Sequence, residues 1–104
     1  MRAVSNSKNG QVSSETIFKF SQNHDRLTAS YSGGKIEYGQ IIGWIDDDGV
    51  IDMLYHHMDR DGEIYAGHSV TTPEILPNGK LRLHEAWEWT YGKIGQGSSV
   101  LEEI

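Results

Sequence analysis

The sequence predicts an all-β domain, a single antiparallel up-and-down meander that closes into a small barrel. Gly is abundant (12) and Pro is scarce (2), and the glycines recur in turn-like steps such as Asn9-Gly10, Asp48-Gly49 and Asp61-Gly62. Asn-Gly and Asp-Gly steps tolerate the positive φ angles that tight hairpin turns require. Short runs rich in Ile, Val, Thr, Tyr, Phe and Trp lie between these turns, and such residues favour strands.

These runs predict seven or eight consecutive strands. They are expected at 15–22, 26–32, 35–45, 50–57, 63–72, 80–91 and 98–103, with an opening strand near 2–6. Within 81–91, Ala86 and Glu88 favour a helix, but the Leu, Trp and Tyr residues fall at even spacing, which is the period of a strand. A short capped helix is the alternative for 98–104, because Ser99 and Glu102 have capping-box spacing. Both prolines lie in segment 73–79, which is the longest internal loop expected.

The hairpin turns also predict which residues share a face, because opposed residues in an antiparallel pair point to the same side. A turn at 46–49 places Trp44 opposite Ile51 and Tyr38 opposite His57. Continued through the neighbouring turns, the same face is expected to hold Phe18, Phe20, Leu27, Ala29, Tyr31, Gln40, Ile42, Met53, Tyr55, Ile64, Ala66, His68 and Val70. A sheet with no helix to cover its apolar face must close on itself, so a barrel follows.

Length, charge and composition exclude several classes of protein. The 104 residues allow a single domain, 1–104, and the formal net charge of −6 argues against nucleic-acid binding, which needs a basic face. The absence of Cys excludes disulfides and Cys-ligated metals. No export segment or apolar run of about 18 residues is evident, so a cytoplasmic protein that does not bind membranes is expected.

Several motifs are spread over nearly the whole chain. They are Asn6-Ser-Lys-Asn-Gly-Gln-Val-Ser13, Tyr31-Ser-Gly-Gly34, Tyr55-His-His57, Gly62-Glu-Ile64, Ser69-Val-Thr-Thr-Pro-Glu74, Leu76-Pro-Asn-Gly-Lys-Leu-Arg-Leu-His-Glu85 and Trp87-Glu-Trp-Thr90. Together they resemble a family of small bacterial proteins of no established activity that often carry the label N-acetylglutamate synthase. That label implies an acetyl-CoA site, but the Arg/Gln-x-x-Gly-x-Gly/Ala motif usual at such sites does not occur here, so acetyl transfer is not expected. As a fold, the family resembles lipocalin and fatty-acid-binding barrels by analogy.

The inner face is expected to be rich in polar groups, which must be hydrogen-bonded to one another, to water or to a ligand. A barrel of about eight strands can hold one small molecule. The sequence therefore predicts a site for a small, partly apolar ligand, with a filled core as the alternative. The candidate ligand-binding residues are Tyr31, Tyr38, Gln40, Trp44, Tyr55, His57, His68, Glu85, Trp87 and Trp89.

Two further functions remain open. An enzyme would use His57 or His68 as a base, Glu85 as an acid or orienting carboxylate, and Tyr55 as a donor. A homodimeric interaction module would present outward apolar residues, and the candidates for that surface are Ile41, Ile45, Leu54 and Tyr65.

No metal or other cofactor is expected. His56 and His57 are adjacent on a strand and point to opposite faces, and the expected register separates His57 from His68 by about 13 Å, at ~3.3 Å per residue. His24 lies in a turn and His84 is expected to face outward with Arg82. The acidic clusters 46–49 and 59–63 lack the spacing of a calcium loop and are expected to be solvated hairpin tips.

Overall fold

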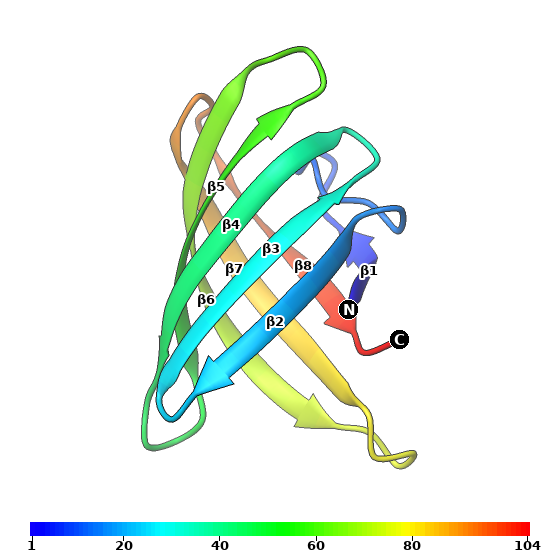
Figure 1. Cartoon of the computed structure of the whole chain (residues 1–104), viewed down its shortest axis with the longest axis vertical. Coiled ribbons are helices and arrows are strands. Elements are labelled where there is room, and N and C mark those ends of the chain that lie inside the picture. Colours follow the sequence, from blue (N-terminus) through cyan, green and yellow to red (C-terminus); the bar gives the residue numbers. More distant parts are fainter.

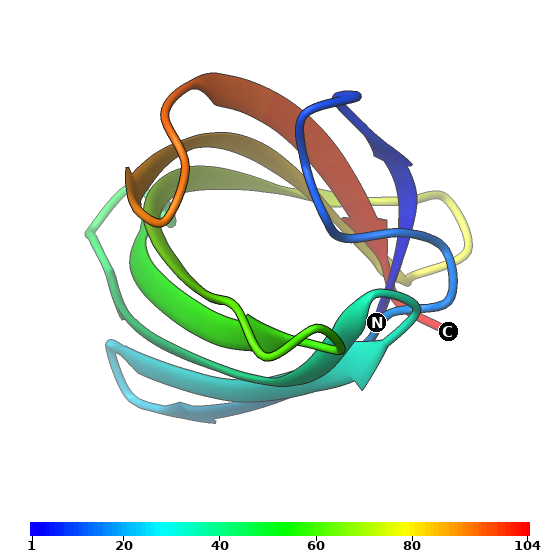
Figure 2. The same ribbon diagram turned by 90° about the horizontal axis from the view of Figure 1, so that it is seen from above.

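The computed structural model describes residues 1–104 as one closed barrel of eight antiparallel strands, each paired with its neighbour in the sequence and the last with the first. The strands are β1 (Arg2–Asn6), β2 (Ile17–Asn23), β3 (Arg26–Gly33), β4 (Ile36–Ile45), β5 (Ile51–Asp59), β6 (Ile64–Ile75), β7 (Leu81–Tyr91) and β8 (Gln96–Glu102). Figure 1 shows the strands inclined to the long axis of the molecule, and Figure 2 looks into the barrel. The structure contains no helix that could span a membrane.

The predicted fold class is confirmed. All eight predicted strands are present, the opening strand included. Residues 81–91 form β7, with Leu83 and Trp87 buried at the expected even spacing. Segment 96–102 is a strand rather than a capped helix, because β8 pairs along its whole length with β7 and also with β1.

The predicted register is wrong by one residue at both hairpins of β5. Gly43, not Ile42, lies opposite Met53, and Tyr65, not Ile64, lies opposite His57. A shift of one residue moves every side chain of a strand to the other face. Residues of β4 and β6 that are expected inside therefore lie on the outer face: Tyr38, Gln40, Ile42, Trp44, Ile64, Ala66, His68 and Val70. Trp44, for example, is 73% exposed and Tyr38 is 55% exposed.

Glycines take the inward positions that this shift creates. A Cβ atom at Gly39 would lie 2.3 Å from the Tyr31 ring, and one at Gly67 would lie 2.2 Å from the Tyr55 hydroxyl. The large aromatic side chains of β3 and β5 thus fill the space that neighbouring strands leave empty. The predicted inner face is correct for strands in which apolar and polar residues clearly alternate. Phe18, Leu27 and Met53, for example, are buried as predicted.

The expectation of a long loop at 73–79 is also wrong. β6 continues through Pro73, which pairs with Leu83, and the chain reverses between Leu76 and Lys80. β5 does not extend alongside Pro73, because β5 begins at Ile51, which lies opposite Thr71. Pro73, which has no N–H to donate, is therefore accommodated on that side of β6.

The longest connection is 7–16, between β1 and β2. It lies at one side of the open end of the barrel in Figure 2 and is tied to the sheet by side-chain hydrogen bonds. Asn6 Nδ2 donates to Val12 O (2.9 Å) and Asn9 Nδ2 donates to Gln96 O (3.1 Å). This connection places the side chain of Gln11, which is buried, against the interior of the barrel.

Candidate ligand-binding site

A cavity inside the barrel is the candidate site. The space in it that is open to the centre of a water molecule is about 40 Å³. The lining residues come from all eight strands and the 7–16 connection: Asn6, Gln11, Val12, Phe18, Tyr31, Ile41, Met53, Tyr55, His57, Ser69, Glu85, Trp87, Trp89 and Ser99.

Aromatic rings form much of the wall. Phe18 stacks on Tyr31 with ring centroids 4.9 Å apart, and Trp87 lies 5.4 Å from Trp89. Tyr55 meets Trp89 edge to face at 6.0 Å. Such contacts fix the orientation of the rings and leave an apolar surface toward the cavity.

A chain of hydrogen bonds crosses the buried part of the site. His57 Nε2 donates to Gln11 Oε1 (2.5 Å), so His57 Nδ1 accepts from the Tyr31 hydroxyl (2.8 Å). Gln11 Nε2 in turn donates to Asp59 Oδ2 (3.0 Å), and Asp59 Oδ1 accepts from the backbone N–H groups of Asp61 and Glu63. This arrangement needs a neutral imidazole, and burial lowers the pKa of His57 to about 4.

Glu85 is the acidic group of the cavity. It projects from β7, and Ser99 Oγ on β8 donates to its Oε1 (2.8 Å). Burial raises the pKa of Glu85 to about 7, although hydrogen bonds from Ser99 and Thr71 act in the opposite direction. No Lys or Arg side chain lines the cavity, so Glu85 has no counterion there.

Two other polar groups of the wall are held by the protein itself. Trp87 Nε1 donates to Asn6 Oδ1 (3.1 Å), which joins β7 to the end of β1. Tyr55 Oη donates to the backbone carbonyl of Glu88 at 3.3 Å. Burial raises the pKa of the Tyr31 hydroxyl and that of the Tyr55 hydroxyl well above the usual value of tyrosine. Both hydroxyls therefore stay protonated.

The structure brings six of the ten candidate residues together and separates the other four. Tyr31, Tyr55, His57, Glu85, Trp87 and Trp89 line the cavity. Tyr38, Gln40, Trp44 and His68 do not, because the register of β4 and β6 turns them outward. On the outer face Gln40 Nε2 donates to Tyr38 Oη (3.0 Å), and His68 pairs with Asp52 and lies 3.6 Å from Glu88.

Sequence reasoning missed several lining residues. Ser69 would have followed from the correct register of β6, but small polar side chains give no hydrophobic signal. Gln11 lies in a connection without periodicity, so its entry into the barrel had no sequence signal.

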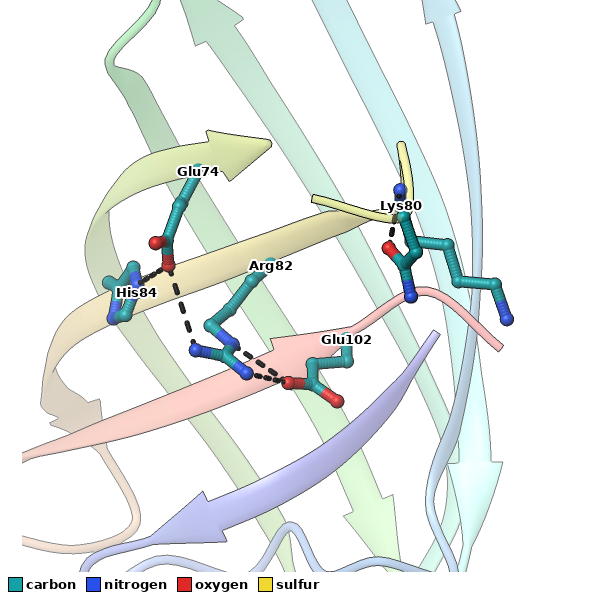
Figure 3. A network of polar contacts seen from close by, with 6 residues as sticks. Glu74, Lys80, Arg82, His84 and Glu102 are labelled. Atoms are coloured by element: carbon teal, nitrogen blue, oxygen red, sulfur yellow. Dashed lines mark hydrogen bonds and ion pairs between the residues drawn. The ribbon is translucent and has the colours of Figure 1, made fainter. Parts of the chain in front are cut away.

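A further ionic network lies on the outer face of β6, β7 and β8. Glu74 Oε1 accepts from His84 Nε2 at 2.9 Å, and Arg82 Nε donates to Glu102 Oε1 at 2.7 Å (Figure 3). His84 faces outward with Arg82, as expected. No group of three or more His, Asp or Glu side chains is placed to hold a metal ion.

Comparison with known proteins gives one finding. No curated protein and no solved structure matches the chain. The sequence profile of the family described as "Avidin-like protein" matches residues 1–104, which is the whole chain. The closed eight-stranded barrel agrees with that match. The chain belongs to the avidin-like family.

Proposed function

We propose that this barrel binds a small, partly apolar molecule in its interior cavity. The observation that carries the proposal is the combination of an aromatic wall with a few inward polar groups, Tyr31, Tyr55, His57 and Glu85. Ligand sites are typically apolar clefts with a small number of polar groups that fix orientation. Eight-stranded barrels of the lipocalin and streptavidin type hold one small ligand, and membership of the avidin-like family supports the same use of the interior.

The size of the cavity restricts the ligand. A water molecule requires about 10–15 Å³ of space for its centre, so a region of about 40 Å³ corresponds to a few waters. The ligand is therefore compact, unless the 7–16 connection moves to enlarge the site. A completely filled core is the alternative, and it predicts that no probe enters.

The geometry favours binding over catalysis. Both ring nitrogens of His57 are engaged, one by Tyr31 and the other by Gln11, so neither is free to take a proton from a substrate. His68, the other candidate base, lies on the outer face and pairs with Asp52. The cytoplasmic location and the resemblance to proteins labelled N-acetylglutamate synthase stay predictions.

Methyl NMR during titration with benzyl alcohol tests the proposal. Ile41 and Met53 line the cavity, whereas Ile42 lies on the outer face and serves as an internal control. We expect saturable shifts of the Ile41 and Met53 methyl signals, caused by the ring current of the probe, and no saturable shift at Ile42.

A cavity-filling substitution provides the matched control. Ser69→Val adds bulk to the lining, and Ser98→Val adds the same bulk at an exposed position of β8. Binding should weaken in the first variant and persist in the second. If the Ile41 and Met53 signals of the natural sequence do not respond to benzyl alcohol or to the smaller isobutanol, the interior is a filled core.

The outer face offers a second candidate, the homodimeric interaction. Ile42 and Leu54, which are 62% and 57% exposed, lie opposite each other on β4 and β5, next to Trp44 and Val70. The expected dimer surface is corrected at three of its four positions. Ile41, Ile45 and Tyr65 lie on the inner face of the sheet, and only Leu54 faces outward. A second copy of the chain would cover the outer face, and light scattering should then show a dimer that Trp44→Lys converts to a monomer. A monomer at every concentration of the natural sequence excludes it.

A further inference from the structure

The cavity contains one acidic side chain and no Lys or Arg. Glu85 faces Thr71 on β6 and Ser99 on β8, and the other titratable groups of the lining are Tyr31 on β3 and Tyr55 and His57 on β5. The Lys93 ammonium lies over Tyr65 and Trp89 and is not part of the lining. A ligand that carries a negative charge would therefore meet Glu85 and no compensating cation.

The aromatic wall also favours positive charge. The faces of aromatic rings are negative, and they attract ammonium groups within about 6 Å of the ring centroid. The chain itself uses this attraction, because Lys93 Nζ lies 5.2 Å from the Tyr65 centroid and 5.7 Å from the Trp89 centroid. Phe18, Tyr55 and Trp87 offer similar surfaces inside the cavity.

We propose that the ligand of this cavity is a small organic cation, a primary ammonium or an amidinium on an apolar body, with the Glu85 carboxylate as its counterion. The aromatic rings would surround the body of the ligand, while Ser99 and Thr71 hold the carboxylate in place. This inference rests on the proposed function and specifies its ligand class.

Binding of such a cation is coupled to the loss of a proton. When Glu85 is protonated, the carboxylic acid releases its proton to solvent and the resulting carboxylate pairs with the incoming ammonium. The cation remains protonated throughout, and no covalent bond to the ligand forms or breaks. Between pH 5 and 8 neither tyrosine ionises and His57 stays neutral, so Glu85 is the group of the lining that titrates.

The affinity for a cation should therefore rise with pH. The apparent affinity is reduced by the fraction of protein in the competent state, here the ionised Glu85. For a carboxyl with a pKa of about 7, this fraction increases more than tenfold between pH 5.5 and pH 7.5. A neutral ligand of the same shape should show no comparable dependence.

Three probes of matched shape test the inference: benzylamine, benzyl alcohol and benzoate, each titrated against methyl signals of Ile41 and Met53. Isobutylamine, isobutanol and isobutyrate form a smaller matched set for a tighter cavity. At pH 7.5 we expect the amine to bind at least tenfold more tightly than the alcohol, and the carboxylate to bind more weakly than the alcohol. Calorimetry in two buffers of different ionisation enthalpy should show proton release with the amine at pH 6.

Glu85→Gln should remove the preference for the amine and its pH dependence while keeping affinity for the alcohol. Glu88→Gln is the matched control, because it makes the same change on the same strand at an exposed outer position. If amine and alcohol bind equally, or if Glu85→Gln keeps the preference, the cation inference is wrong and the proposed function stands. If no probe of either set binds, both are wrong.

Discussion

Glu85 and His57 line the same cavity, and burial keeps both of them neutral over part of the pH range. Between its raised pKa of about 7 and the usual 4.5, native Glu85 retains a proton that the unfolded chain releases, so it lowers stability as pH rises through this window. His57 acts in the opposite direction. Between 6.5 and about 4 the unfolded chain takes up a proton that native His57 refuses, so stability falls as pH falls. The two effects oppose each other from about pH 4.5 to 6.5.

Glu85→Gln should therefore stabilise the protein at alkaline pH. The rise of the pKa from 4.5 to about 7 corresponds to up to about 3 kcal/mol once the carboxyl is ionised. Urea unfolding should show this gain at pH 8.5 and almost none at about pH 3, where Glu85 is protonated in both states. Glu88→Gln, with an exposed carboxyl, should change stability little at either pH. Parallel stability curves for Glu85→Gln and the natural sequence would contradict a buried carboxyl.

At the scale of the strand, glycine determines which face of β4 points inward. Gly39 lies opposite His57 and against the ring of Tyr31, and the interior has no room there for a side chain. Aromatic residues on one strand and glycines on the next form complementary layers, which is how close packing is achieved in a small barrel. The register of β4 thus depends on the size of its inward residues more than on their hydrophobicity.

Gly39→Ala should destabilise the protein by about 1–3 kcal/mol, which is the usual cost of adding bulk to a packed core. The cost should largely disappear when Tyr31→Ala is also present, since the atoms that the new Cβ would meet are those of the Tyr31 ring. A double-mutant cycle measured by urea unfolding gives the coupling energy. A coupling energy near zero would mean that Gly39 is not required for the packing of Tyr31.

The strands and the barrel could be predicted from the sequence, because turn glycines and runs of β-favouring residues mark them locally. The faces of β5 and β7 could be predicted as well, since their apolar residues alternate. β4 has apolar residues on both faces, Ile41 beside Ile42 and Trp44 beside Ile45, so alternation does not select one. This ambiguity explains why Tyr38, Gln40 and Trp44 are predicted on the wrong face.

The position of Gln11 could not be predicted from the sequence. It depends on contacts with His57 and Asp59, which are remote in sequence and come close only in the folded chain.

At the scale of the whole molecule, the barrel has one weakly paired seam. β1 and β2 are paired at a single position, Arg2 opposite Ile17, whereas β2 pairs with β3 along its whole length and β1 pairs with most of β8. The 7–16 connection joins these two strands and carries Gln11 into the cavity. Local opening of a protein begins where few hydrogen bonds and contacts must be broken. The β1–β2 seam is therefore expected to open before any other pair of strands.

Amide hydrogen exchange tests this expectation within β2 itself. The N–H of Phe18 points toward β1 and donates to Met1 O, so by the two-residue period of a strand the N–H groups of Phe20 and Gln22 point the same way, beyond the single β1 pairing. They should exchange much faster than those of Lys19 and Ser21, which face β3. Equal protection of the two sets would mean that the seam is closed. Fast exchange confined to the seam side would identify the part of the wall whose opening gives a small molecule access to the cavity.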